Sequence, residues 1–223
     1  MALFESLVDL KQAVREEAER LNHAKFELAF PRIIASAEHR MFHGADEPLK
    51  TDPLRLRVME TTVTIAFVAG DGVLPDGYLS TLRLQWNGYP KTSPRYEVPH
   101  TFFTNRYTTT SGSPTVYTIE GGGIYLSPLI TGDISFVYYK RPLELSDDTD
   151  SNVVLTTYPM LYFHAALIEA YSYIRNPNEM QKHYAAYRSL SGGLLRSQSN
   201  ARRASSSPLA PRLPNWRDPR MKP

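Results

Sequence analysis

The segment from Pro159 to Ile174 constrains the fold more than any other part of the chain, because it is apolar or aromatic on nearly every helical face. A helix of this kind must be covered on most sides, either by its own domain or by neighbouring subunits. The surrounding stretch, residues 153–174, also contains His164 and Glu169, whereas a membrane span needs about 20 predominantly apolar residues. We therefore predict a buried helix and no membrane partner.

Helical patterns occupy both ends of the chain. The first 21 residues place apolar side chains near helical spacing, which is typical of an amphipathic helix. A second helix is predicted from Pro31, a residue favoured at the first helical position, to Gly44, a natural C-terminal stop. Beyond the tight Asn176-Pro177 connection, a returning helix is predicted over residues 179–190, ending near Gly192-Gly193.

The middle of the chain has the period of β-strands from about residue 57. Asn87-Gly88 and the run Gly121 to Gly123 predict hairpin turns. We expect five or six short strands in one small antiparallel sheet. Beyond the first strand, the expected strands cover residues 78–86, 115–119, 124–126 and 134–139, with a helical or irregular insert over residues 98–107.

These patterns together predict an α+β fold. Helices from both ends of the chain need partners for their apolar faces, so we expect them to form one helical bundle with the antiparallel β domain inserted between them. The predicted parts are residues 1–54 and 146–195 for the bundle, residues 55–145 for the β domain, and residues 196–223 for an extended basic tail rich in Pro, Ser and Arg.

The sequence offers little chemistry for catalysis. It contains no cysteine, which excludes a disulfide framework, a thiolate metal site and a cysteine nucleophile. His39 and His43 have the spacing of two zinc ligands on a helix, but no third ligand is identifiable. The glycines at 121–123 lack the Lys-Ser or Lys-Thr of a phosphate loop, and the aspartates at 147–150 lack the ligand spacing of a calcium loop. We predict a non-enzymatic protein without metal or cofactor.

The C-terminal tail carries most of the charge asymmetry. Residues 196–223 contain seven bases and one acid, which leaves 18 of the 25 bases and 22 of the 23 acids in the rest of the chain. A basic tail on a mildly acidic body indicates an acidic protein or a nucleic acid as its partner.

Proline spacing favours a protein partner for this tail. Pro208, Pro211 and Pro214 recur every three residues, which is the turn length of a polyproline II helix. This spacing places Ala210, Leu213 and Trp216 along one apolar edge, and an extended peptide has no core of its own in which to bury a tryptophan. We therefore expect the tail to lie in a groove of another protein.

An ordered series of motifs runs through nearly the whole chain. The stretches are LVDLKQAV, FPRIIASAEHRMF, RLRVMETTVTIAF, LPDGYLSTLRLQWNG, YTIEGGGIYLSP, ISFVYYKRPLELSDD and TTYPMLYFHAALIEAYSYIRNPNEMQKHYAAY, followed by the basic tail. Each motif is weakly specific on its own, but the ordered series resembles the head-to-tail adaptor proteins of tailed bacteriophages, also called head-completion or neck proteins.

The resemblance implies a structural role in the virion. Members of this family are expected to form rings, usually of twelve copies, between the portal and the next tail or nozzle protein. Viral DNA would pass through the ring without sequence-specific binding, and the chain would be made in the cytoplasm of the bacterial host. The tail of this chain is longer and richer in proline than the resemblance leads us to expect.

The resemblance also implies two sets of site residues. The portal-binding set is Arg196, Arg202, Arg203, Pro208, Leu209, Pro211, Arg212, Leu213, Pro214, Trp216 and Arg217. The subunit-packing set is Tyr158, Tyr162, Phe163, Tyr171 and Tyr173.

Two other functions stay open at this point. A DNA-binding or packaging accessory protein could act through the basic tail, with binding that weakens steeply as salt rises. A metal-dependent enzyme could use His39 and His43, and it would then hold a stoichiometric metal.

Overall fold

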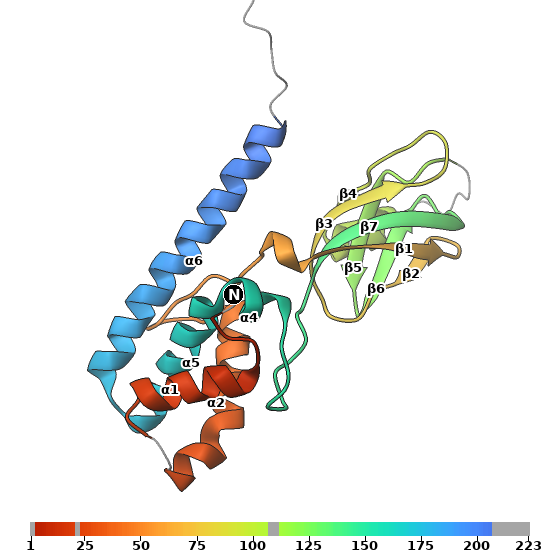
Figure 1. The fold of residues 1–223 in the computed structure, drawn as a ribbon. Helices are drawn as coiled ribbons and strands as arrows, with labels where there is room; N and C mark the ends of the chain where they lie inside the picture. The colour runs from red at the N-terminus through yellow and green to blue at the C-terminus, as the bar shows by residue number, and fades with distance from the viewer. Residues whose placement is uncertain (1–2, 21–22, 107–111, 207–223) are drawn as a thin grey trace, which may run out of the picture.

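A helical lobe and a β lobe lie side by side, and one long helix runs past both of them (Figure 1). The computed structural model describes residues 3–20, 23–106 and 112–206. The α+β prediction, with helices from both ends of the chain around an inserted β region, is confirmed. The helices are α1 (Leu7–Glu17), α2 (Ala24–His43), α3 (Pro99–Asn105), α4 (Val153–Thr157), α5 (Pro159–Ile174) and α6 (Pro177–Ser206), with a short 3-10 helix η1 (Arg57–Met59). The strands are β1 (Glu60–Phe67), β2 (Asp71–Val73), β3 (Tyr78–Trp86), β4 (Arg95–Tyr96), β5 (Val116–Glu120), β6 (Gly123–Ser127) and β7 (Gly132–Lys140).

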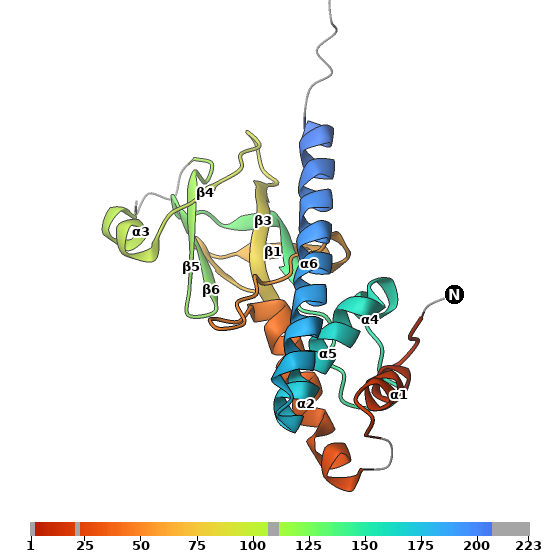
Figure 2. The same cartoon turned by 90° about the vertical axis from the view of Figure 1, so that its left-hand side faces the viewer.

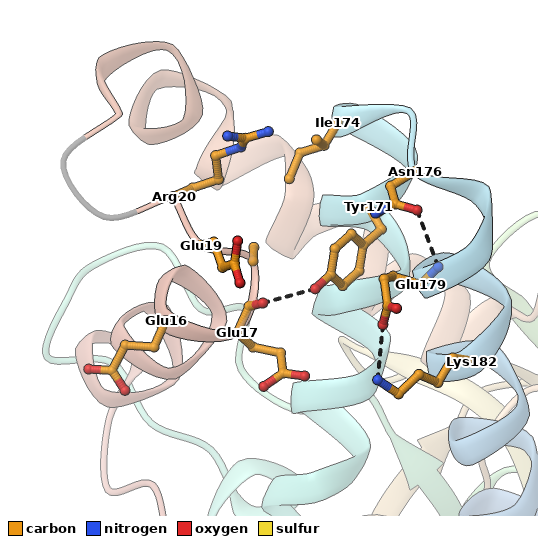
Figure 3. A pocket seen from close by; sticks show the side chains of 10 residues that line it. Glu16, Glu17, Glu19, Arg20, Tyr171, Ile174, Asn176, Glu179 and Lys182 are labelled. Atoms are coloured by element: carbon orange, nitrogen blue, oxygen red, sulfur yellow. Dashed lines mark hydrogen bonds and ion pairs between the residues drawn. The ribbon is translucent and has the colours of Figure 1, made fainter.

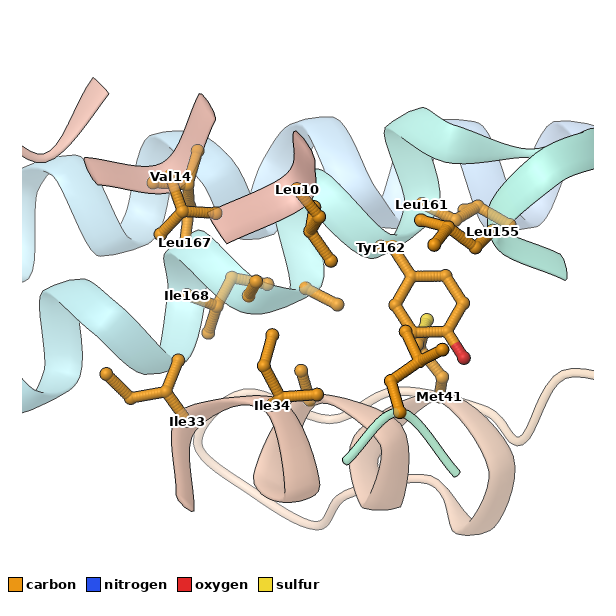
Figure 4. Packing of buried hydrophobic residues seen from close by; sticks show 14 of the residues in the cluster. Leu10, Val14, Ile33, Ile34, Met41, Leu155, Leu161, Tyr162, Leu167 and Ile168 are labelled. Atoms are coloured by element: carbon orange, nitrogen blue, oxygen red, sulfur yellow. The ribbon is translucent and has the colours of Figure 1, made fainter. Parts of the chain in front are cut away.

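Helix α5 is the centre of the helical lobe and packs against α1, α2, α4 and α6. Its side chains Leu167 and Ile168 are fully buried among Leu10 and Val14 of α1 and Ile34 of α2 (Figure 4). Full burial of one such side chain stabilises the fold by about 1.5 to 3 kcal/mol. The all-round apolar pattern of this helix is thus explained largely by contacts within its own chain.

The start of α2 differs from the prediction, because the helix begins at Ala24 and contains Pro31 in its interior. An interior proline costs a helix about 3 kcal/mol. The turns before it carry Phe26 and Phe30, which are both buried and meet edge to face with centroids 5.7 Å apart. Burying two rings stabilises these turns by about 1.5 to 3 kcal/mol each, which offsets the cost of the proline.

The end of α6 also differs from the prediction. The helix continues through Gly192 and Gly193 to Ser206, so the expected stop at the glycines is wrong. Residues 196–206, expected as the start of an extended tail, are helical, and residues 207–223 lie outside the described part of the chain. Two helical glycines cost only about 1 kcal/mol each, and contacts beyond them, described below, hold the last turns.

The β lobe contains two sheets, so the prediction of a single antiparallel sheet is wrong. The first has the strand order β1-β7-β3 and is antiparallel, with Glu60 opposite Tyr139 and Phe67 opposite Gly132. The second has the order β2-β6-β5-β4, and its β4-β5 pair is parallel. A separate apolar cluster, including Phe67, Ile124 and Phe136, is buried in this lobe. Period-two alternation identifies strands, but it does not say which strands share a sheet.

The two predicted hairpin turns have different outcomes. The turn at Gly121–Gly122 is confirmed, because it joins the antiparallel strands β5 and β6 and both glycines have positive φ. The hairpin at Asn87-Gly88 is wrong, because β3 is not paired with the next strand, β4. Instead the Trp86 amide donates a hydrogen bond to the carbonyl of Thr92 at 2.8 Å, which closes a wider loop. The expected helical insert is confirmed as α3.

Candidate functional site

The C-terminal half of α6 leaves the helical lobe and contacts the base of the β lobe (Figure 2). Leu194, Gln198 and Arg202 recur at four-residue spacing and therefore share one face of the helix. The Arg57 amide donates to the Gln198 side-chain oxygen at 2.9 Å. Leu194 packs against the core of the helical lobe. This face holds α6 to both lobes.

Arg202 makes the terminal contact of this face. Its guanidinium forms an ion pair with Glu60 at the start of β1 and a hydrogen bond with the hydroxyl of Tyr139 on β7. It also lies 5.5 Å from the centre of the Tyr139 ring. Partial burial lowers the pKa of Arg202, but the Tyr139 hydroxyl and the Glu60 carboxylate together raise it above its ordinary value. We call Gln198 and Arg202, with Arg57, Glu60 and Tyr139, the α6 clasp.

Away from the α6 clasp, α6 is exposed at Arg196, Ser197, Ser199 and Asn200. Arg196 is exposed and lines a surface groove of about 720 Å³ between α6 and the loop that follows α2. Arg188 and Lys50 lie in the same groove together with Glu47 and Asp52. Charged side chains of both signs make up much of this groove, whereas small-molecule sites are lined mostly by apolar side chains.

The structure covers only part of the predicted portal-binding set. Arg196 is exposed, whereas Arg202 is held in the α6 clasp. Arg203 lies in the last turn of α6. The other eight residues, from Pro208 to Arg217, lie outside the described part of the chain.

The predicted subunit-packing residues occupy several different positions. Tyr162 is 0% exposed, and its hydroxyl donates to Glu38 at 3.2 Å and accepts from the Asn152 amide at 2.7 Å. Tyr171 is also buried in its own lobe, where its hydroxyl donates to the carbonyl of Glu17 at 2.9 Å. These two tyrosines therefore stabilise their own chain.

Three of the subunit-packing residues retain accessible surface. Tyr173 is 39% exposed, and its hydroxyl donates to the Lys25 carbonyl at 3.2 Å. Tyr158 and Phe163 are half-buried, and the Phe163 ring lies 6.1 Å from that of Phe4. These three side chains are the accessible part of the predicted set.

Glu38 is a buried carboxyl group that sequence reasoning missed. It is 3% exposed, and it accepts hydrogen bonds from the Leu145 amide at 3.1 Å and the Tyr162 hydroxyl at 3.2 Å. Burial raises its pKa from about 4.5 to about 7. The group joins α2 to α5 and to the segment that leads back from the β lobe. In the sequence Glu38 is one acid among charged neighbours, so the pattern does not indicate that its side chain is buried.

The candidate metal residues have local structural roles. The His39 and His43 rings stack with their centres 5.0 Å apart. Among residues 3–20, 23–106 and 112–206, no group of three or more His, Cys, Asp or Glu side chains could hold a metal ion. The Asp150 carboxylate accepts hydrogen bonds from the amides of Ser146 and Asp147, as expected of a turn residue.

A second histidine pair lies between α5 and α6. The Nδ1 atoms of His164 and His183 are 3.1 Å apart, and the His183 ring stacks on Tyr171. Burial lowers the pKa of both histidines. A neutral pair can share one hydrogen bond, so this contact fits helix packing.

An acidic surface pocket of about 470 Å³ opens where α1 ends and α5 turns into α6 (Figure 3). Glu16, Glu17, Glu19 and Glu179 line it, and Glu179 forms an ion pair with Lys182 at 3.0 Å. The pocket lies near the start of α6, whereas the α6 clasp lies near its end. Its charge suits a basic group, but it lacks the buried acid–base pair that catalysis would require.

Among the described residues, no helix is both long enough and apolar enough to cross a membrane. The described part of the chain thus consists of two lobes with one long helix running along them, and side-chain contacts hold that helix in place.

Comparison with known families identifies the class of protein. The model of the SU10 adaptor protein family matches residues 6–212. The chain belongs to this family of phage head-tail adaptors, which makes it a virion component of the head-tail junction that contacts other head and tail proteins. A search of curated proteins found no match.

Proposed function

We propose that copies of this chain form a ring, of twelve subunits, that joins the portal to the next tail or nozzle protein and continues the DNA channel. The observation that carries the proposal is the family match over residues 6–212. Geometry supports it, because the 30-residue helix α6 spans about 45 Å and extends beyond the helical lobe. Such a helix can present the basic tail to a protein at some distance from the body. No catalytic step is part of this role.

The portal-binding part of the proposal begins with the exposed face of α6 and continues in the tail. Arg196 and Arg203 would lie on the helix, and the remaining basic, proline and tryptophan residues would follow in extended conformation. Arginines can pair with an acidic portal surface, and proline rigidity reduces the entropy that the tail loses on docking. Arg202 would contribute through the α6 clasp, where it fixes the direction of the helix.

The subunit-packing part of the proposal rests on exposed aromatic surface of α4 and α5. Tyr173, Tyr158 and Phe163 keep enough accessible area to contact a neighbouring subunit. Aromatic side chains are favoured at such interfaces. The surplus of acids over bases before residue 196 suits a ring around DNA, because like charge lets the genome pass without sticking.

Truncation provides the test, and the structure sets where to cut. A chain ending at Ser206 keeps the α6 clasp and should fold with an unfolding midpoint close to that of the full chain, yet it should not join the portal. A chain ending at Leu195 also loses Gln198 and Arg202 and should be less stable as well. The measurements are thermal unfolding and co-sedimentation with purified portal rings.

Normal portal attachment by the chain ending at Ser206 would rule out the tail as the binding element. Electron microscopy of virions, with the chain cross-linked in place, tests the ring itself. A chain absent from the particle, or found away from the head-tail junction, would contradict the proposal as a whole.

The charge of the tail favours one alternative, a DNA-binding or packaging accessory protein. Seven bases against one acid over residues 196–223 would neutralise phosphates and give binding that falls steeply with salt. Titration of duplex DNA with the full chain and with the chain ending at Leu195 separates the two functions. Equal DNA binding by these two chains would remove the tail from this alternative.

A further inference from the structure

Strand β1 forms an open edge of the β lobe. It pairs with β7 on one side, and among the residues that the structure describes no other strand runs along its outer side. Its eight residues contain no proline, lysine or bulge. The other edges are blunted, because β3 has two register shifts and β2 and β4 have three and two residues. Short or bulged edges resist strand addition, whereas a long regular edge accepts it.

The turn after β1 shows which backbone groups point to this edge. Val68 and Asp71 exchange both backbone hydrogen bonds at 3.0 Å, across a turn in which Ala69 and Gly70 have positive φ. The Val68 amide and carbonyl therefore point away from β7. The next amide, that of Ala69, points the other way and donates to the Thr131 hydroxyl at 3.1 Å.

Alternation extends this orientation back along β1. Backbone groups on a strand alternate in direction with a period of two residues. Ala66, Thr64 and Thr62 therefore present their amides and carbonyls on the outer edge, as Val68 does. Their side chains are exposed, which fits the same alternation. Three successive donor and acceptor pairs thus face outward along about 13 Å of strand.

A groove lies beside these backbone groups. Beyond the Val68–Asp71 pair, β1 and β2 diverge and enclose about 530 Å³, lined by residues 63–66 of β1 and 71–73 of β2. Val68 and Val73 stand at the groove 69% and 77% exposed. The charged group in the lining is Asp71, which is already paired with Arg106 at 2.5 Å.

The lining determines the chemistry of an occupant. Unpaired backbone groups require an extended strand, and exposed valines favour apolar or β-branched side chains on it. The neutral lining gives no advantage to a basic segment. The tail of this chain is therefore a poor fit, since it is strongly basic and prolines 208, 211 and 214 have no amide to donate. Three other segments of this chain fit poorly for the same reason. The long described connections 44–56, 87–94 and 141–152 all contain proline and at least one charged residue.

We propose that the outer edge of β1 receives an extended, uncharged, proline-free strand from a different protein of the head-tail junction. This second contact rests on the proposed place of the chain in the virion, and it lies on a different lobe from the helical surfaces assigned to subunit packing. The added strand lengthens the β1-β7-β3 sheet and covers Val68 and Val73.

Residue-resolved hydrogen exchange tests the proposal on the full chain, first as purified protein and then in purified virions. In the purified protein, the amides of Thr62, Thr64 and Ala66 should exchange quickly, and those of Thr61, Val63 and Ile65, which face β7, should exchange slowly. In virions, the three outer amides should slow by at least about tenfold, the change expected when an exposed amide gains a hydrogen bond.

Every other pattern overturns the proposal. Slow outer amides in dilute purified protein would mean that the chain covers its own edge. Slowing that appears with concentration, without another virion protein, would assign the edge to a second copy. Outer amides that stay fast in virions would leave the edge free while the place of the chain at the junction stands. A chain absent from virions would remove both this proposal and the proposed function.

Two substitutions give an independent reading. Thr64→Pro removes an outward amide, and Ala66→Lys places a charge at the edge, whereas Thr64→Val keeps the backbone groups. Both blocking variants should enter virions at least about tenfold less often than the Thr64→Val control. The Lys variant keeps every backbone donor, so it decides the question if the proline variant does not fold. Incorporation of Ala66→Lys at the control level would overturn the proposal.

Discussion

At the scale of single residues, Glu38 couples the fold to pH. Its carboxyl group lies among α2, α5 and Leu145, and burial raises its pKa to about 7. A raised pKa means that the folded chain holds the proton more tightly than the unfolded chain does. The stability from this group is fully present below about pH 4.5, falls as pH rises to about 7, and stays low above that.

Replacing Glu38 with Gln should remove this dependence. Gln keeps the oxygen that accepts from Leu145 and Tyr162, and it carries no charge at any pH. At pH 8 the variant should be more stable than the natural chain by about 2 to 3 kcal/mol, and at pH 4.5 the two should be nearly equal. Urea unfolding of both chains at the two pH values measures this. The exposed Glu120→Gln is the control, and an unchanged pH slope in the Glu38 variant would contradict the assignment.

At the scale of elements, α6 shows how a helix continues through two consecutive glycines. A Cβ atom added at Gly192 or Gly193 meets no atom within 4 Å. No close contact requires glycine at these positions. The helix continues through them because Leu194, Gln198 and Arg202 contact other parts of the chain beyond the glycines. Local propensity favours a helix end at the glycines, and contacts distant in sequence override that propensity.

Alanine at these positions should stabilise the chain. Gly192→Ala and Gly193→Ala should each add about 0.5 to 1 kcal/mol, because alanine loses less backbone freedom on folding and fills open space. Gly44→Ala is the opposite case, since Gly44 has φ +83 and a Cβ there would lie 2.7 Å from the Thr51 carbonyl oxygen. Thermal unfolding of the three variants compares them. Loss of stability at 192 or 193 would show that the glycines serve a close contact.

At the scale of the whole molecule, the α6 clasp joins the two lobes. The helical lobe supplies Gln198 and Arg202, and the base of the β lobe supplies Arg57, Glu60 and Tyr139. Apolar packing also joins the lobes, because the cluster of the helical lobe includes Tyr139 of β7 and contacts Leu79 and Leu82 of β3. Ion pairs that remain partly exposed contribute little to global stability, so the clasp should matter mainly for the direction in which α6 points.

Arg202→Ala should therefore free the last turns of α6 without unfolding the protein. The free energy of unfolding should fall by less than about 1 kcal/mol, while amides 198–206 should exchange with solvent much faster. Arg196→Ala removes an exposed arginine on the same helix and is the matched control. Equal exchange rates in the two variants would show that the clasp does not hold the helix.

Hydrophobic patterning in the sequence predicts which kinds of helix and strand the fold contains. The all-round apolar pattern at 159–174, the change to period two near residue 57 and the glycine turn at 121–122 predict the buried helix, the inserted strands and the β5-β6 hairpin, because each depends on local periodicity or backbone preference. The ordered motifs and the charge of the tail predict the adaptor family.

Only the tertiary structure decided the rest. Burial of Phe26 and Phe30 stabilises the turns of α2 before Pro31. A positive-φ turn at Ala69–Gly70 separates β1 and β2, which belong to different sheets. The α6 clasp holds the last helix beyond its glycines. The structure also shows that the hydroxyls of Tyr162 and Tyr171 form hydrogen bonds within their own lobe. Each of these outcomes depends on contacts between residues far apart in sequence, and local periodicity carries no information about such contacts.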